Sequence, residues 1–523
     1  MTRSNAGNTS FHKKRLHDII SYARPRDFLI MVWAAHALMN GNREAAEKRL
    51  NHNLAPEDYA FAAKAWVPPW ELEQLINEYF AMPSFRFSDR KRLDCSKWGS
   101  FAKCVNRLKA FNNSESVKDH PENLILQAMP RILFPQYNWQ KGWVNAKRLV
   151  RYHNIYGNPK CSDFLFKATG LSASDILKYG MASYAICRGD PAARVETDFS
   201  LIDGRKEEFR NFVNHFGLSF KAFREHTLDV RRGNVISEFK RSPLAEFPII
   251  IGNENDEPIA FIPLPDLIVR RVTEGLYYDL VGEPALRNEI GKEFEKHCFT
   301  QLEHQLPTNQ TLLGEFEYTR GMSPDILILD TDSKSISIIM ECKSRRLPRR
   351  VLASPNPYRD APEVYQDIIK GIIQIWRFAS DVDSNLLNDG EMSISEETVG
   401  ILQTLDPWLV MDPSTTANVT NEACKVAEEK GIDPKFWIPI AVVNVDDWEE
   451  IIENTDFSDI VRLVREMSSE KFYGYLMTSI KSELKKEGVI FSENTKEKYP
   501  WMEKLKEIFE WLPENIPASL DAV

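Results

Sequence analysis

The amino-acid sequence predicts an α/β fold, a mixed β-sheet flanked by helices, for the C-terminal half of the chain and a mostly α-helical N-terminal half. Before Pro284, apolar residues recur mainly at spacings of three and four, the period of a helix with one buried face. After Pro284, short apolar runs with strand-like alternation take turns with longer helical patterns. Gly282 and Pro284 interrupt both patterns, so we expect a domain boundary there.

Composition is typical of a globular protein, and the cysteine pattern leads us to expect the reducing cytoplasm as its compartment. The hydrophobic fraction is 43% and the charged fraction 27%. The chain has 66 Lys and Arg residues and 76 Asp and Glu residues, so its overall charge does not indicate a nucleic-acid-binding protein. It does not exclude one either, because such binding depends on local patches of charge and not on net charge. Seven scattered cysteines without a C-x-x-C pair argue against disulfides or structural zinc. The first ten residues lack an apolar signal core, so we expect no membrane partner.

Four segments follow from these patterns. We expect a helical domain over residues 1–98 and a mostly helical domain over 99–284, with a β-hairpin near 247–263. An α/β domain is expected over 285–456, and an amphipathic helical segment over 457–523.

Residues 164–185 have the outline of a DNA-binding helix-turn-helix. Gly170 ends one helix as a C-cap, and Ser172 opens the next with Asp175 three residues later, close to a capping box. Two helices that simply pack together inside a helical domain produce this pattern more often than a DNA reader does.

The expected element order in the α/β domain is α-β-β-β-α-β, followed by a further helix and strand. The helices are expected at 287–306, 362–379 and 417–430, and the strands at 312–319, 325–329, 335–343, 398–405 and 437–443.

Two of these strands bring charged residues together. Pro324 can begin a strand but cannot sit inside one, so Asp325 is expected at the mouth of the strand 325–329. Residues 330–334 are of types that favour a tight turn, so we expect this strand to pair with 335–343 as a hairpin. In the second strand Glu341 and Lys343 share one side, opposite an apolar, core-facing row. The hairpin therefore predicts that Asp325, Glu341 and Lys343 converge.

The preceding helix adds a third acid. Glu295 falls on the apolar stripe of the helix 287–306, and a carboxylate on a buried stripe needs a partner such as a metal, a water or Lys343.

This constellation suits hydrolysis of a phosphodiester bond. Neighbouring carboxylates repel unless a cation lies between them, and Mg²⁺ (with Mn²⁺ as a substitute) prefers oxygen ligands. Lys343 could orient or deprotonate the attacking water or stabilise developing negative charge. The backbone carbonyl of Cys342 could be a further metal ligand.

The arrangement resembles the PD-(D/E)XK nuclease superfamily, which has the restriction-endonuclease-like fold. The matching residues are Pro324-Asp325, Glu341-Cys342-Lys343 and Gly291-x-x-Phe294-Glu295, within residues 285–455, about a third of the chain. The resemblance implies that Asp325 and Glu341 bind the metal, that Lys343 assists the attacking water, and that Glu295 binds metal or orients water. Because members of the superfamily mostly cut DNA, it also implies an endodeoxyribonuclease, by analogy one of bacterial restriction or anti-phage defence.

Weaker candidates surround this set. The basic run Arg345, Arg346, Arg349 and Arg350 could bind phosphates, but a solvated loop explains it equally well. Lys370 and Gln374 on the next helix could also bind phosphates, but an ordinary exposed helix face explains them better. Glu315 and Glu317 are further candidate ligands on the preceding strand.

Three alternatives stay open: an RNA nuclease, a catalytically silent module of the same fold that binds nucleic acid or protein, and a helical assembly protein whose α/β part is structural. A homo-oligomer would suit double-strand cutting. The sequence has no G-x-x-x-x-G-K-[ST] loop, so ATP-driven translocation would need a separate ATPase or regulatory partner.

Overall fold

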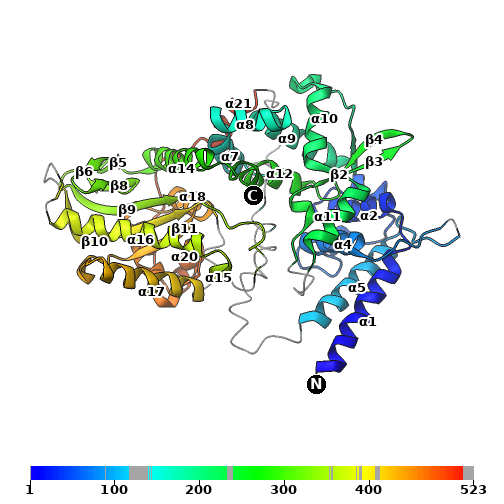
Figure 1. Cartoon of the computed structure of the whole chain (residues 1–523), viewed down its shortest axis with the longest axis horizontal. Helices are drawn as coiled ribbons and strands as arrows, with labels where there is room; N and C mark the ends of the chain where they lie inside the picture. The colour runs from blue at the N-terminus through cyan, green and yellow to red at the C-terminus, as the bar shows by residue number, and fades with distance from the viewer. Residues whose placement is uncertain are drawn as a thin grey trace. The chain divides into compact units, whose positions relative to one another are not determined.

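The computed structural model describes residues 2–88, 90–116, 139, 142, 144–232, 240–352, 354, 357–384, 386–387, 392–406 and 413–510. These residues form a mixed α/β protein with a helical N-terminal region, as the sequence predicts (Figure 1). The chain separates into two compact units. Described residues up to Gly282, with those from Met502 onward, belong to the first unit, and Glu283–Trp501 belong to the second.

The first unit is built mainly from helices and includes one small sheet. The described residues of segments 1–98 and 99–284, which the sequence separates, belong to this one unit up to Gly282. The sheet has the strand order β1-β4-β3-β2, and β3 and β4 form the antiparallel hairpin expected near 247–263. Its helices are α1 Thr2–Ile20, α2 Pro25–Met39, α3 Arg43–Glu47, α4 Pro69–Ala81, α5 Trp98–Ser116, α7 Ala146–Tyr156, α8 Pro159–Thr169, α9 Ala173–Gly189, α10 Lys206–Phe216, α11 Phe220–Val230, α12 Asp266–Val272 and α13 Tyr277–Leu280, and its strands are β1 Ala192–Arg194, β2 Gly217–Ser219, β3 Ile249–Glu254 and β4 Glu257–Phe261.

The second unit has a five-stranded mixed sheet of order β11-β10-β9-β8-β5. β8 pairs antiparallel with β5 and β9, whereas β10 pairs parallel with β9 and β11. The elements are α14 Pro284–Gln305, β5 Gln310–Gly314, β6 Glu317–Tyr318, β7 Gly321–Met322, β8 Ile326–Asp330, β9 Ser335–Lys343, α15 Pro357–Asp360, α16 Pro362–Asp383, β10 Ser393–Thr404, α17 Pro413–Glu429, β11 Ile440–Asn444, α18 Val445–Asn454, α19 Phe457–Met467, η9 Glu470–Phe472 and α20 Met477–Lys486; α21 spans Trp501–Ile508.

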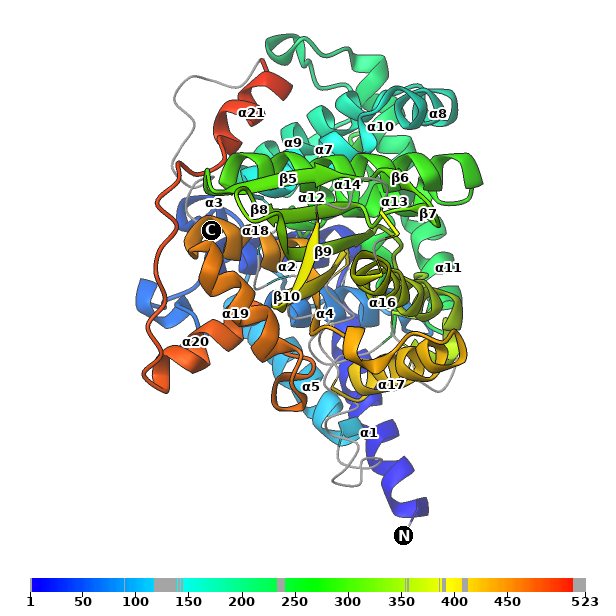
Figure 2. The same ribbon diagram turned by 90° about the vertical axis from the view of Figure 1, so that its left-hand side faces the viewer.

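Helices cover both faces of this sheet. Figures 1 and 2 show α14 on one side, and α16 and α17 on the other. Leu327, Ile339 and Leu402 pack against α16 in one apolar core, so the helices bury the sheet as they do in other sheets with parallel strands.

Several expected boundaries are wrong. The strand expected over 312–319 ends at Gly314, and the chain turns into a separate ribbon of β6 and β7. The reason is local, because the backbone N–H of Phe316 donates to the Ser323 hydroxyl (2.9 Å) and not to β8. The helix expected over 417–430 begins earlier, at Pro413. Within 457–523, residues 489–500 form no helix, and 511–523 lie outside the described residues.

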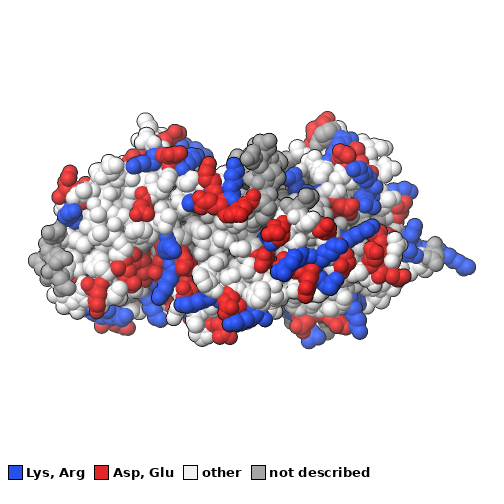
Figure 3. Space-filling view, turned by 90° about the horizontal axis from the view of Figure 1, so that it is seen from above, with Lys and Arg blue, Asp and Glu red and all other residues white. Residues whose placement is uncertain are grey.

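The described helices do not include one with the length and apolar content needed to cross a bilayer. Charged side chains of both signs are interspersed on the surface drawn in Figure 3, without an extended field of one colour. On that face, contact with a polyanion would have to come from a few local cations.

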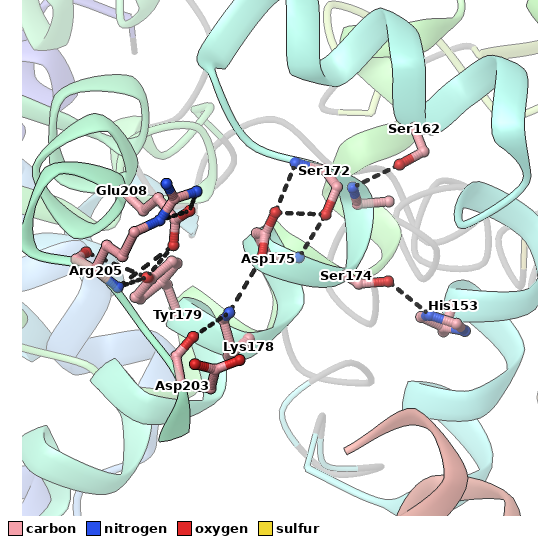
Figure 4. Close-up of polar contacts among 11 residues, drawn as sticks. His153, Ser162, Ser172, Ser174, Asp175, Lys178, Tyr179, Asp203, Arg205 and Glu208 are labelled. Atoms are coloured by element: carbon pink, nitrogen blue, oxygen red, sulfur yellow. Dashed lines mark hydrogen bonds and ion pairs between the residues drawn. The ribbon is translucent and has the colours of Figure 1, made fainter. Parts of the chain in front are cut away.

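Helix α9 is a packed core helix. The expected capping box is present: the Ser172 hydroxyl accepts from the backbone N–H of Asp175 (3.1 Å), and the Asp175 carboxylate accepts from that of Ser172 (3.1 Å). Figure 4 shows the first turns of α9 tied to their surroundings, with Ser174 bonded to His153 (3.1 Å) and Lys178 donating to the Asp203 carbonyl (3.3 Å). A recognition helix presents these positions to base edges, so the structure favours helix packing over a DNA-reading role.

Candidate active site

The β8–β9 hairpin is fixed by its turn. Asp330 accepts hydrogen bonds from the backbone N–H (2.9 Å) and the hydroxyl (2.8 Å) of Ser333. Lys334 adopts a left-handed backbone with φ of 55°. This turn sets the register in which Ile326 lies opposite Met340.

That register places Asp325 beside the end of β9. Asp325 immediately precedes β8, and its Oδ2 accepts a hydrogen bond from the backbone N–H of Cys342 at 2.6 Å. The acid of one strand therefore lies next to Glu341 and Lys343 of the other strand.

Glu341 and Lys343 form a buried ion pair. The Lys343 Nζ donates to Oε1 of Glu341 at 2.6 Å. Glu341 is 3% exposed, and its second oxygen, Oε2, is buried and has no hydrogen-bond partner within the described part of the chain. Burial alone would lower the pKa of Lys343, but the charges of Glu341 and Asp325 raise it, so this side chain is an ammonium ion. One carboxylate oxygen is thus left for a further positive group.

The environment of this pair differs from the expectation. Glu341 and Lys343 were expected opposite a core-facing row, yet both faces of β9 are buried. The covering element is α16. A Cβ on Gly371 would lie 2.2 Å from Leu402 Cδ1, 3.0 Å from Lys343 Cε and 3.3 Å from Glu341 Cγ. The α16 backbone therefore rests on the stems of the ion pair.

Gly371 is a site residue that the sequence analysis missed. It is the one glycine within α16, and an isolated glycine inside a helical pattern is a signal for close packing. One turn further along, Gln374 accepts a longer hydrogen bond from Lys343 Nζ at 3.4 Å.

Glu295 reaches the same region from α14. Burial raises the pKa of Glu295 to about 7, and the nearby charges of Glu315 and Glu341 add to the effect. The pKa of Asp325 rises to about 8 through burial and the charges of Glu341 and Glu295. Burial also raises the pKa of Glu341, against the opposing charge of Lys343. The acids thus share one electrostatic environment, although no hydrogen bond joins Glu295 to the other three site residues in the described part of the chain.

The thiol of Cys342 lies on the α14 side of the sheet. A hydrogen bond with Cys298 and burial raise its pKa well above the ordinary value, so the thiol serves packing. The backbone of Cys342 meets the site through its N–H group; a role for its carbonyl stays a prediction.

The two outer acids differ in position. Glu315 is exposed after β5 and influences both Glu295 and Glu341 electrostatically. Glu317 is exposed on β6, outside the five-stranded sheet.

The basic run after β9 does not form one cationic surface. Arg346 is buried, and its Nε donates to Oδ2 of Asp406 at 3.0 Å. It therefore joins this loop to the segment after β10 and is not displayed for phosphate contact. Arg345 pairs with Asp367 of α16 at 2.5 Å and is partly exposed.

The remaining candidate cations are more accessible. Arg350 is exposed, and its Nη1 donates to the Asp360 carbonyl at 3.4 Å; Arg349 is half-buried. Lys370 is exposed on α16, 3.7 Å from Asp367. Lys370 and Gln374 lie on the solvent side of that helix.

The donor set fits a cation that needs few protein ligands. Among the described residues, no group of three or more His, Cys, Asp or Glu side chains is placed so that it could hold a metal ion. Mg²⁺ commonly binds one or two carboxylates and completes its shell with water and substrate phosphate. The free Oε2 of Glu341 beside Asp325 is compatible with that mode. Comparisons with protein-family models, curated proteins and solved structures find no match to this chain.

Proposed function

We propose that the second unit is a Mg²⁺-dependent endonuclease of the restriction-endonuclease-like fold that hydrolyses phosphodiester bonds of DNA. The order α14-β5-β8-β9-α16-β10 fits the α-β-β-β-α-β core of that fold, with β6 and β7 as an inserted ribbon. A role in bacterial restriction or anti-phage defence is an analogy with the family and rests on no contact in this chain.

One observation carries the proposal. At the end of the hairpin, Asp325 accepts a hydrogen bond from the backbone N–H of Cys342, the residue after Glu341, and Glu341 has a buried oxygen with no hydrogen-bond partner among the described residues. Burying a carboxylate oxygen without compensation is costly, and like charges nearby increase the cost. A divalent cation between Asp325 and Glu341 would relieve both effects, with Glu295 as a third acid beside it.

The chain's own residues account for positioning and charge. When bound, Mg²⁺ would offset negative charge on the phosphoryl oxygens. Asp325 and Glu341 would hold it. Lys343, as an ammonium ion, would donate a hydrogen bond to the attacking water or to a phosphoryl oxygen, where negative charge develops in the transition state. Glu295, with its pKa near 7, can take up or release a proton at neutral pH.

A cleavage assay tests this proposal. The full chain would be incubated with supercoiled plasmid DNA and with RNA, in Mg²⁺, Mn²⁺ or EDTA. We expect metal-dependent DNA cleavage that falls by about 10²-fold or more in Asp325→Asn and in Lys343→Met. Asp332→Asn in the exposed β8–β9 turn and Lys296→Met on the exposed side of α14 are matched controls that should keep full activity.

The other outcomes separate the alternatives. Cleavage of RNA but not of DNA would mean that the substrate is RNA and that the protein is an RNA nuclease. Metal-independent binding without cleavage would favour a silent binding module. Cleavage that survives both site substitutions would remove the site from the mechanism.

A further inference from the structure

Two consecutive side chains at the end of β9 face opposite helices. The stem of Lys343 lies against α16, where a Cβ on Gly371 would come within 3.0 Å of its Cε. Ser344 is the next residue, and its Oγ would lie 3.7 Å from a Cβ on Gly291 of α14. Because neighbouring residues of an extended chain point to opposite sides, the candidate active site has a second flank on the α14 side.

A space beside Gly291 is open on this flank. A Cβ there would meet Ser344 Oγ at 3.7 Å and Glu295 Oε1 at 3.9 Å, with no closer heavy atom among the described residues. Both distances are ordinary van der Waals contacts, so an atom of that size fits without any shift of its neighbours. The two atoms that face the space are oxygens, so the space suits a polar group better than an apolar one.

The hydroxyl of Ser344 is available to such a group. The residue is half-buried, and its hydroxyl has no hydrogen-bond partner among the described residues and is not shielded from solvent. Ser337 on β9 differs, because its hydroxyl donates to Oε1 of Gln310 at 3.3 Å. A serine hydroxyl rotates to suit its partner, so Ser344 can donate to an acceptor that lies over Gly291.

Lys292 brings positive charge to the same flank. It is exposed on α14, and its ammonium group has no hydrogen-bond or ion-pair partner in the part of the chain that the structure describes. Burial raises the pKa of Glu295, and the charge of Lys292 acts against that rise, as expected for residues three apart on one side of a helix. Lys296, one turn further along, is instead 3.9 Å from Glu293. Lys292 can therefore neutralise an anion that approaches beside Glu295.

A hydroxyl donor and an ammonium group beside an open stretch of helix suit an oxyanion. A phosphodiester group carries one negative charge, and its two unesterified oxygens can each accept one of these bonds. Glu295 repels a small free anion that has no other contacts, whereas a phosphate within a strand is held there by its neighbours as well. The chemistry therefore favours a phosphate of a bound strand over free inorganic phosphate.

We propose that Ser344 and Lys292, beside the open backbone of Gly291, bind a phosphodiester group of the DNA strand next to the scissile phosphate. The inference rests on the proposed function, because its ligand is the strand that reaches Asp325 and Lys343. It adds the path of that strand, which crosses α14 as it passes the end of β9. Ser344 and Lys292 thus position the substrate and take no part in the chemical step.

Equilibrium binding tests the proposal apart from cleavage. A fluorescein-labelled DNA duplex would be titrated with the full chain at several salt concentrations, with Ca²⁺ in place of Mg²⁺. We expect Lys292→Gln to make the slope of log affinity against log salt shallower by about 0.9, because one phosphate contact is lost. We expect Ser344→Ala to weaken binding about three- to tenfold without changing the slope, because it removes an uncharged donor. Lys296→Gln and Ser337→Ala are matched controls that should bind as the native protein does.

Cleavage kinetics in Mg²⁺ give a second readout. Lys292→Gln and Ser344→Ala should raise KM in proportion to the lost affinity and leave kcat unchanged, because the contact is made equally in the bound substrate and in the transition state. Thermal unfolding would check that each variant is folded.

The outcomes separate this proposal from the proposed function. A native salt slope in Lys292→Gln, or native affinity in Ser344→Ala, would overturn the phosphate contact even if the native protein cuts DNA. If the expected binding changes occur in a protein that does not cut DNA, the contact stands and the nuclease function fails. A native protein that neither binds nor cuts DNA would overturn both.

Discussion

The ion pair with Lys343 offsets much of the free-energy cost of burying the Glu341 carboxylate in the sheet. Glu341 is almost fully buried, and in the part of the chain that the structure describes only one of its oxygens receives a hydrogen bond. A buried acid with a single partner is an expensive feature for a structural sheet, where an apolar residue would serve as well. Its presence next to Asp325 is one of the observations on which the proposed catalytic role rests.

The lack of a side chain at Gly371 lets α16 pack closely on the Glu341–Lys343 ion pair, and replacing this glycine tests that packing directly. Gly371→Ala would place a methyl group against Leu402 and Lys343, so we expect a loss of about 1–3 kcal/mol in unfolding free energy from overpacking. Cleavage activity should fall as well, because Lys343 must move. The measurement is chemical denaturation of both proteins alongside the cleavage assay.

Gly291→Ala is the matched control. Gly291 also lies within a helix, α14, but a Cβ there would meet nothing closer than 3.7 Å. The substitution should raise stability by up to about 1 kcal/mol through helix propensity. If Gly371→Ala behaves like this control, α16 does not pack on the ion pair as described.

At the scale of elements, features fixed by neighbouring residues could be predicted from the sequence, whereas features fixed by contacts between distant elements could not. The β8–β9 hairpin was predictable, because turn chemistry around Asp330 and the alternation of residues 335–343 are both written in adjacent residues. Coverage of Glu341 by α16 was not, because it depends on packing between elements. The pairing of Arg346 with Asp406 spans 60 residues, so the arginine-rich run looked like a solvated or phosphate-binding loop.

A second ion-pair cluster ties elements of the first unit together and predicts a pH dependence. Glu78 of α4 contacts His17 of α1 (3.1 Å) and Arg231, which follows α11 (2.6 Å). Burial raises the pKa of Glu78, but the His17 hydrogen bond and the Arg231 charge outweigh it and lower the pKa from 4.5 to about 2. The folded state therefore favours the carboxylate.

The sign of the effect follows from that shift. The stabilisation, roughly 3 kcal/mol, is present above the unfolded pKa and is lost as pH falls towards 2. Glu78→Gln should thus be less stable than the native protein at pH 7, and the difference should shrink between pH 5 and pH 2. Thermal unfolding at several pH values measures it. Glu44→Gln, in an exposed pair with Lys48, should show almost no difference at any pH.

At the scale of the whole molecule, the net charge of −10 gives no general attraction for a polyanion, so the proposed nucleic-acid binding would rely on local cations such as those near the site. Each phosphate contact changes the slope of log affinity against log salt by about 0.9. Lys370 is an exposed cation on α16. We expect Lys370→Ala to make the slope of log affinity against log salt shallower by about 0.9, without lowering the free energy of unfolding.

Arg346→Ala should do the opposite. It should leave the salt slope unchanged but lower stability, because it leaves Asp406 buried without its guanidinium partner. Binding titrations of a DNA duplex at several salt concentrations, with denaturation curves for each variant, distinguish the two. A changed slope in Arg346→Ala would mean that this side chain reaches nucleic acid after all.

The most direct test of the central claim is divalent-metal binding, measured by electron paramagnetic resonance of Mn²⁺ added to the full chain at pH 8. The account predicts a bound Mn²⁺ population that Asp325→Asn and Glu341→Gln each weaken strongly and that Asp332→Asn leaves unchanged. Equal Mn²⁺ binding in all four proteins, or none in the native protein with or without DNA, would contradict it.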